Sequence, residues 1–246
     1  MTHGYGSPFL TAEWRYLAML NYEIDPAILL PFVPNGTELD TWNGTSFASM
    51  VGFLFLDTRV LGMAVPFHRD FEEINLRFYV RRRAEDGWRR GVIFVKEIVP
   101  RWAIAATARW LYNENYVALP TGHVLLRSPA NPANVESAKY YWIFHGRTDF
   151  IALETRGEPY HFVEGSQEEF ITRHYWGYSA QRDGGTAEYR VEHPVWRIWQ
   201  TTTCRFDCDV ESLYGRPFAA ALSKPPLSAF LAEGSTVTVY KGRRVS

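Results

Sequence analysis

The alternation of apolar and polar side chains is clearest over residues 70–101. Two long runs, FEEINLRFYVRRR and RRGVIFVKEIVPR, flank an Asp86-Gly87 pair, which is typical of a β-hairpin. Successive side chains of a strand point to opposite faces. In the first run, one face carries Glu72, Ile74, Leu76, Phe78 and Val80, and the other carries Phe71, Glu73, Asn75, Arg77, Tyr79 and Arg81. We predict that the first face is buried and that the second is either wet surface or the lining of a polar cavity.

The second run of the hairpin is apolar on both faces, apart from Lys96 and Glu97. A strand covered on both faces lies centrally in a sheet or barrel. Lys96 and Glu97 point to opposite faces, so each needs a partner of its own, because buried charges are seldom unpaired. The need of Lys96 and Glu97 for two separate partners indicates a functional site here, but it does not identify a substrate.

The rest of the chain reads as many short strands with few helices. Asp25-Pro26 predicts the start of a short helix, and Asn43-Gly44 predicts a hairpin between 38–42 and 45–56. The pattern at 102–112 is the best helix in the chain. Further strands are expected at 13–23, 123–127, 139–146, 150–155, 160–164, 186–193, 194–206 and 235–240. These elements predict a single α+β domain over 1–246, built on a large, closed or nearly closed antiparallel sheet.

Composition narrows the class of protein. The chain has 246 residues, 46% of them hydrophobic, and a net charge of −1, which suits one sizeable core and argues against nucleic acid as a partner. The arginines at 81–83 and 89–90 are interpreted as solvated strand ends, with phosphate contact as the minor alternative. The aromatic content of 16% is compatible with a homo-oligomer.

Several other classes of site are not indicated by any motif. Neither a phosphate-binding glycine loop nor a dinucleotide fingerprint occurs, so no cofactor is expected. The histidines lack metal-ligand spacing, and Cys204 and Cys208 alone make a poor zinc site. The two cysteines are interpreted as reduced thiols of a cytoplasmic protein. We expect neither a signal peptide nor a membrane span.

Four stretches carry a family resemblance: PFLTAEWRYLAMLNYEIDPAILLPFVPNG, FEEINLRFYVRR, GVIFVKEIVPR and ARWLYNENY. Together they resemble the YqjF-like proteins, a bacterial family of unknown function that looks like a branch of the acetoacetate decarboxylase superfamily. The resemblance implies a cone-shaped β-barrel with a central cavity and a few helices. In the decarboxylase, a lysine amine forms a Schiff base with a β-keto acid, and a second lysine lowers the pKa of the first.

The resemblance also assigns residues. The family's cavity arginine falls on Arg15 and its glutamate on Glu73. The paired lysines fall on Tyr116 and Val117, so both amines are absent and the Schiff-base mechanism has no nucleophile there. Lys96 is the one candidate for a relocated amine, because an apolar strand would lower its pKa. The alternative roles of Lys96 are a structural ion pair with a carboxylate such as Glu72 and snorkelling of its amine at the strand end.

The leading hypothesis is a binding site for a small, carboxylate-bearing molecule. Arg15 would hold the carboxylate, and Asn75, Arg109, Asn113 and Glu114 would add polar contacts. If the protein is an enzyme, Glu73 would act as acid and base and Tyr116 as proton donor. The alternatives are a non-catalytic structural or interaction module and a lyase or decarboxylase that uses Lys96.

Overall fold

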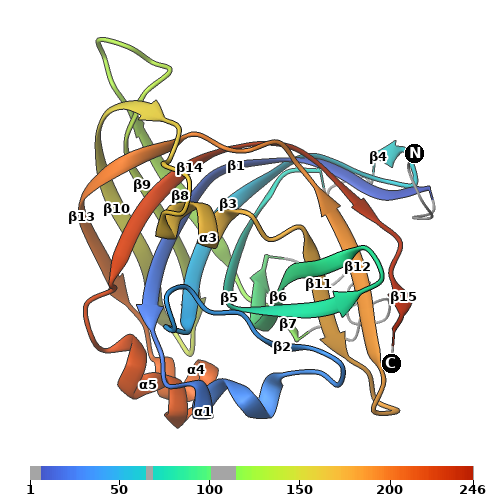
Figure 1. Cartoon of the computed structure of the whole chain (residues 1–246). Helices are drawn as coiled ribbons and strands as arrows, with labels where there is room; N and C mark the ends of the chain where they lie inside the picture. Colours follow the sequence, from blue (N-terminus) through green and yellow to red (C-terminus); the bar gives the residue numbers. More distant parts are fainter. Residues whose placement is uncertain (1–6, 65–68, 101–114, 246) are drawn as a thin grey trace.

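The computed structural model describes residues 7–64, 69–100 and 115–245 and consists mainly of antiparallel strands (Figure 1). The strands are β1 (Pro8–Glu23), β2 (Glu38–Leu39), β3 (Phe47–Val60), β4 (Met63–Ala64), β5 (Phe71–Ala84), β6 (Gly87–Val99), β7 (Tyr116–Ala118), β8 (Thr121–Arg127), β9 (Val135–Phe144), β10 (Arg147–Tyr160), β11 (Trp176–Ala180), β12 (Thr186–Glu192), β13 (Ile198–Asp207), β14 (Ser228–Tyr240) and β15 (Arg243–Arg244). The helices are α1 (Pro26–Leu29), η1 (Leu30–Phe32), α3 (Gln167–Thr172), α4 (Val210–Tyr214) and α5 (Arg216–Leu222).

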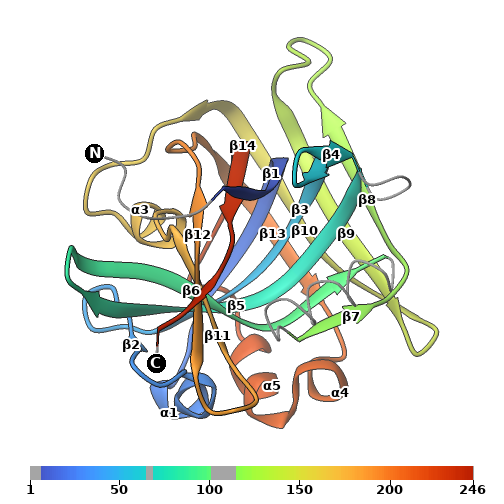
Figure 2. The same ribbon diagram turned by 90° about the vertical axis from the view of Figure 1, so that its right-hand side faces the viewer.

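The strands form one ring-like twisted sheet. Its order runs β12-β11-β6-β5-β3-β1-β14, and β14 also pairs with β12. From β14 the sheet continues through β13, β10, β9 and β8 as an arm, which Figures 1 and 2 show beside the ring. Helices α1, α4 and α5 gather at one end of the molecule in both views, while α3 lies over the centre of the ring in Figure 1.

Two apolar clusters lie on the two faces of β1, β3 and β5. We call inner core the cluster that includes α3 residues, made of Ala12, Leu17, Met19, Phe47, Val51, Phe53, Phe55, Phe71, Tyr79, Val92, Val99, Tyr116, Phe170, Ile171, Trp196, Ile198, Phe230, Ala232 and Val237. We call outer core the larger cluster between these strands, the arm and helices α4 and α5. It includes Leu20, Met50, Leu76, Tyr140, Trp142, Trp199 and Phe218.

The predicted hairpin over residues 70–101 is confirmed as β5 and β6, which pair from Ile74↔Ile98 to Ala84↔Gly87. A bulge between Leu76 and Arg77 shifts the register. The apolar face of β5 packs in the outer core, and its polar face turns toward the inner core, where Phe71 and Tyr79 belong. The polar face is therefore not wet surface over Glu73–Tyr79, because these side chains are buried.

Local signals of the sequence give a mixed outcome. The Asp25 side chain accepts a hydrogen bond from the Ala27 amide and caps α1, as predicted. The predicted pairing of 38–42 with 45–56 is wrong beyond one bridge, because β2 pairs with β5 instead. The strands expected at 150–155 and 160–164 are one strand, β10, which ends at Tyr160. The helix expected at 102–112 lies outside the described residues.

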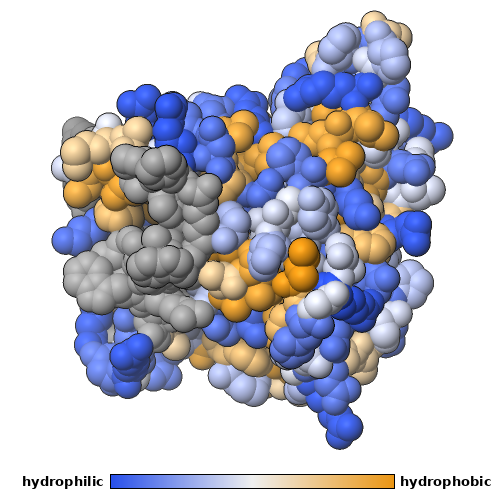
Figure 3. Space-filling model, turned by 180° about the vertical axis from the view of Figure 1, so that it is seen from behind, coloured by the Kyte–Doolittle hydropathy of each residue, from blue (hydrophilic) through white to orange (hydrophobic). Residues whose placement is uncertain are grey.

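The rear surface carries apolar side chains on the arm. Val124 and Leu126 of β8 and Ile143 of β9 are exposed. Figure 3 shows hydrophobic side chains on this rear face, below the part of the molecule that projects at the upper right. In the described ranges, no helix has both the length and the apolar character needed to cross a membrane.

Candidate functional site

Four polar side chains follow one another at every second position of β5: Glu73, Asn75, Arg77 and Tyr79. All four are buried on the inner-core face, with Glu73 only 3% exposed. Across the hairpin, Asn75 pairs in register with Glu97 of β6, and parallel β7 sets Tyr116 beside Glu97. Directly opposed residues on one face have Cβ atoms about 5 Å apart. The sheet therefore gathers these polar groups inside an apolar surrounding.

The Glu73 carboxyl group is the titrating centre of this cluster. Asn75 Nδ2 donates a hydrogen bond to Glu73 Oε1 over 3.0 Å, and the Tyr116 side chain also hydrogen-bonds to the carboxyl group. Burial raises the pKa of Glu73 to about 7, against the opposing effect of both hydrogen bonds and of the Arg77 charge. A carboxyl group with this pKa can both donate and accept a proton near neutral pH.

A second buried polar group, His174 with Asp40, lies beyond Tyr79, at the opposite end of the four polar residues of β5 from Glu73. The His174 ring lies 4.6 Å from the Tyr79 ring, and its Nε2 is 3.1 Å from Asp40 Oδ2, which also accepts a hydrogen bond from Arg90 Nε at 2.6 Å. Burial lowers the pKa of His174 to about 4, so the ring is neutral at neutral pH. The alternation of side chains along β5 identifies Tyr79 as part of this neighbourhood, but it does not identify Asp40 or His174. Asp40 and His174 are 134 positions apart in the sequence, so only the fold joins them.

The residues predicted for the site are only partly brought together. Glu73, Asn75 and Tyr116 meet, as described above. Arg15 forms an ion pair with Glu13 and donates to the Gly234 carbonyl. Its neighbour Trp14 packs on the inner core, so Arg15 points to the opposite face of β1 from that core.

Lys96 also lies apart from Glu73. Its amine donates to the Leu213 carbonyl oxygen at the end of α4 and lies 5.7 Å from the Tyr214 ring, on the outer-core side. The suggested partner, Glu72, instead binds His123 and Thr121. Lys96 and Glu97 do point to opposite faces, as predicted. The remaining predicted residues, Arg109, Asn113 and Glu114, lie outside the described ranges.

All four lysines of the chain belong to the described ranges, and none is placed at the Glu73 cluster. Lys139 lies over the Phe150 ring at 4.3 Å, Lys224 lines a pocket beside α5, and Lys241 is exposed. The described residues also contain no group of three His, Cys, Asp or Glu side chains that could hold a metal ion.

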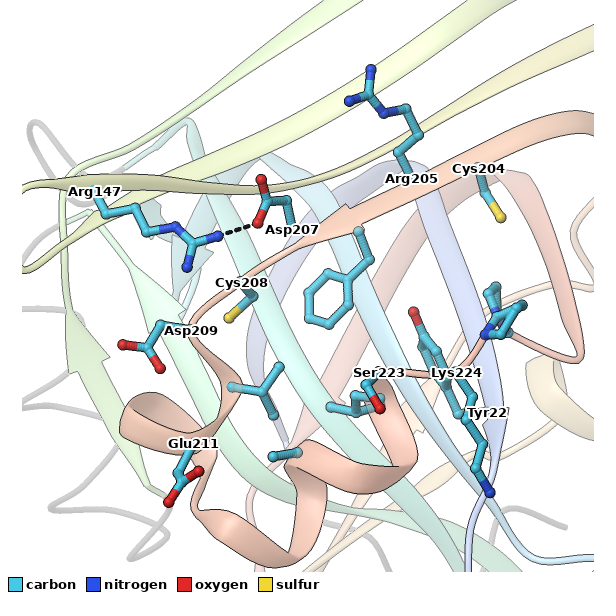
Figure 4. A pocket seen from close by; sticks show the side chains of 16 residues that line it. Tyr22, Arg147, Cys204, Arg205, Asp207, Cys208, Asp209, Glu211, Ser223 and Lys224 are labelled. Carbon is cyan, nitrogen blue, oxygen red and sulfur yellow. Dashed lines mark hydrogen bonds and ion pairs between the residues drawn. The ribbon is translucent and has the colours of Figure 1, made fainter.

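A separate pocket of about 730 Å³ opens between the end of β13 and helices α4 and α5 (Figure 4). Both acidic and basic side chains line it, and Figure 4 shows the Arg147–Asp207 ion pair. Cys204 and Cys208 reach into this region, but burial raises the pKa of both thiols. A thiol with a raised pKa is a poor nucleophile, so this pocket offers little chemistry of its own.

Comparisons with known proteins agree with this architecture. Residues 11–236 match the family DUF2071, described as an uncharacterized conserved protein. A curated relative, the uncharacterized protein YqjF of Bacillus subtilis (strain 168), is 36% identical over 75 residues, which are 30% of this chain and 31% of that protein. The match thus spans less than a third of that curated relative's length.

Three solved structures with a similar fold are enzymes. One is an acetoacetate decarboxylase from Legionella pneumophila (TM-score 0.65, 12% identity, 98% of this chain and 89% of that chain). Another is the enduracididine biosynthesis enzyme MppR complexed with pyruvate (TM-score 0.67, 14% identity, 100% and 93%). The third is an acetoacetate decarboxylase-like enzyme from Sphingomonas wittichii RW1 (TM-score 0.64, 14% identity, 98% and 94%). The acetoacetate decarboxylase-like fold and the YqjF-like resemblance are confirmed.

Proposed function

Since this chain belongs to the DUF2071 family and has an acetoacetate decarboxylase-like fold, we propose that it binds a small carboxylate-bearing molecule at Glu73, Asn75 and Tyr116. The observation that carries the proposal is the buried Glu73 carboxyl group, with a pKa of about 7 and hydrogen bonds to Asn75 and Tyr116. The proposal includes a cone-shaped barrel with a polar central cavity, and it keeps the cytoplasm as the compartment because both cysteines are free.

The chemistry open to this site is proton transfer without a covalent amine. The resemblance places the family's lysines at Tyr116 and Val117, and Tyr116 now hydrogen-bonds to Glu73. As an enzyme, the protein would use Glu73 to take up and return a proton, with Tyr116 as the donor beside it. MppR, which shares the fold, is described in complex with pyruvate, and this supports keto acids as the first ligands to test.

The test is a thermal-shift screen of small carboxylic and keto acids on the wild type, Glu73→Gln and Arg15→Ala. A ligand at 100 times its dissociation constant adds about 2.7 kcal/mol of stability. We expect a hit on the wild type to weaken in Glu73→Gln. Glu136→Gln, at an exposed position, is the matched control and should bind like the wild type. Wild-type protein that responds to no acid would remove the basis of the proposal.

A non-catalytic structural or interaction module is the second candidate, and the aromatic packing of the inner core favours it. The Phe55 and Phe71 rings stack at 4.7 Å, and Trp14 packs edge-on against Phe53 at 5.3 Å. If such side chains fill the interior, no ligand fits beside Glu73. The same screen separates the two candidates, because a filled interior predicts no shift with any acid.

A further inference from the structure

Arg77 is a buried cation without a described anionic partner. It is 9% exposed and stands two positions from Asn75 and four from Glu73 on the same face of β5. Its Nη2 lies 4.0 Å from Met19 Sδ, and its Cζ lies 5.9 Å from the Tyr79 ring centre. Its Nε has no hydrogen-bond partner, and no carboxylate of the described residues lies within ion-pair distance. Two mostly buried arginine side chains behave differently, because Arg82 and Arg89 both pair with Glu188.

A lone buried guanidinium is unfavourable unless something neutralises it. Removing a charge from water without a partner costs several kcal/mol, and a thioether and a ring face repay little of this. The neighbouring titratable groups do not supply a full counter-charge. Glu73 is only partly ionised at neutral pH, and the buried Glu97 beside Asn75 forms no ion pair with Arg77. His174 and His193 have no anionic form and cannot act as counter-ions. An arginine at this buried position therefore points to a negative group that arrives from outside.

We propose that Arg77, rather than Arg15, holds the carboxylate of the bound molecule, and that the ligand is a small monoanionic acid whose other end meets Glu73 and Tyr116. This inference rests on the proposed function and names the residue that fixes the charge of its ligand. Guanidinium groups bind carboxylates through two parallel hydrogen bonds, which suits Arg77.

The spacing on the strand limits the ligand. Residues four apart on a strand are about 13 Å apart at their Cα atoms, and the Arg77 charge still acts on the pKa of Glu73. Only Asn75 stands between them on this face. Asn75 Oδ1 accepts no hydrogen bond from the described residues, so it can take one from a ligand hydroxyl group. A short hydroxy or keto acid fits this row better than a long-chain acid.

The test is calorimetric titration of pyruvate, acetoacetate and the neutral pyruvamide into the wild type, Arg77→Met, Arg77→Lys and Arg15→Ala. We expect Arg77→Met to weaken binding of the two acids by roughly 10- to 100-fold, the usual effect of losing a charge-assisted hydrogen bond, and to change pyruvamide binding less than about 3-fold. Arg77→Lys should recover part of the acid affinity, and Arg15→Ala should leave it unchanged. Arg205→Met, at an exposed arginine of β13, is the matched control.

Each other outcome has a defined meaning. Acid binding that survives in Arg77→Met and is lost in Arg15→Ala overturns the assignment of Arg77 and leaves the proposed function standing. Equal loss of acid and amide binding, or a lower melting temperature in both Arg77 variants with unchanged acid affinity, makes Arg77 a structural residue. A wild type that binds none of the three compounds overturns both proposals.

Discussion

The ionisation of the Glu73 carboxyl group should make the free energy of unfolding of the whole protein depend on pH. Its side chain is buried among apolar groups, and burial acts on its pKa more strongly than the hydrogen bonds of Asn75 and Tyr116 or the charge of Arg77. The ionised form is therefore the unfavourable one in the folded state. In the unfolded chain the same group is in water and ionises freely.

The pH dependence of unfolding follows from this difference. The Glu73 pKa is about 7 in the folded protein and 4.5 as the reference value. Between these pH values the unfolded chain releases the proton while the folded protein keeps it, so the free energy of unfolding should fall as pH rises, by about 3 kcal/mol in all. Urea unfolding across this window should show the fall in the wild type and in Glu136→Gln, and a flatter profile in Glu73→Gln. Parallel wild-type and Glu73→Gln profiles would contradict the assigned titration.

At the scale of single elements, the short helix α4 provides the partner of Lys96, which the sequence alone did not identify. The helix contains only five residues and ends at Tyr214, so its carbonyl groups need donors from elsewhere. Lys96 reaches across from β6 and donates to the Leu213 carbonyl oxygen. Burial lowers the pKa of Lys96, but this amine is already engaged on the outer-core side of the sheet.

A structural role for Lys96 is testable against the lyase alternative. We expect Lys96→Met to lower the free energy of unfolding by about 1–2 kcal/mol, because the helix end loses a charged donor. Lys241→Met, at an exposed lysine, should change stability by less than about 0.5 kcal/mol. Borohydride reduction in the presence of acetoacetate should leave the Lys96 peptide unmodified by mass spectrometry. A reduced adduct on that peptide would instead support the amine mechanism.

At the scale of the whole molecule, Glu188 links segments that are far apart in the sequence. Its fully buried carboxylate accepts hydrogen bonds from Arg82 Nε at 2.7 Å, Arg89 Nη1 at 2.8 Å and the Tyr178 hydroxyl at 3.1 Å. Arg243 of β15 adds a contact at 3.3 Å. Arg82 and Arg89 are thus not the solvated strand ends that the sequence suggested, because they neutralise a buried acid.

Removal of this charge should destabilise the ring of strands. Burial acts to raise the pKa of Glu188, but the hydrogen bond and charges of its arginine partners keep that pKa below its usual value. Glu188 therefore stabilises the fold above pH 4.5 and loses this contribution as pH falls through its folded pKa. At neutral pH, Glu188→Gln should cost about 3 kcal/mol in urea unfolding, because two mostly buried arginines lose their partner.

The same strand provides a control for this variant. Glu192 contacts Arg190 and Tyr240 at the exposed surface, so Glu192→Gln should cost at most about 1 kcal/mol. Similar losses in the two variants would show that Glu188 is no special link between the strands.

The sequence by itself determined the hairpin β5–β6, the cap of α1 and the face that each side chain of β5 takes. These features depend on alternation and turn chemistry within a few residues, which act locally. Alternation also put Lys96 and Glu97 on opposite faces. The family resemblance pointed to Glu73, whose role in a site stays a prediction, and showed that Tyr116 stands where the family has a lysine.

Only the tertiary structure decided what each face of a strand packs against. The polar face of β5 is buried by segments that are distant in the sequence: Phe170 of α3 lies 5.4 Å from the Tyr79 ring, and Met19 of β1 contacts Arg77. Alternation in the sequence puts Trp14 and Arg15 on opposite faces of β1. Only the structure shows that the Trp14 face packs on the inner core, so that Arg15 points away from it. The Asp40–His174 contact and the Glu188 network likewise depend on strand order. Pairing between distant strands is set by the burial of the whole sheet and not by local sequence, which is why these groups could be identified only in the folded chain.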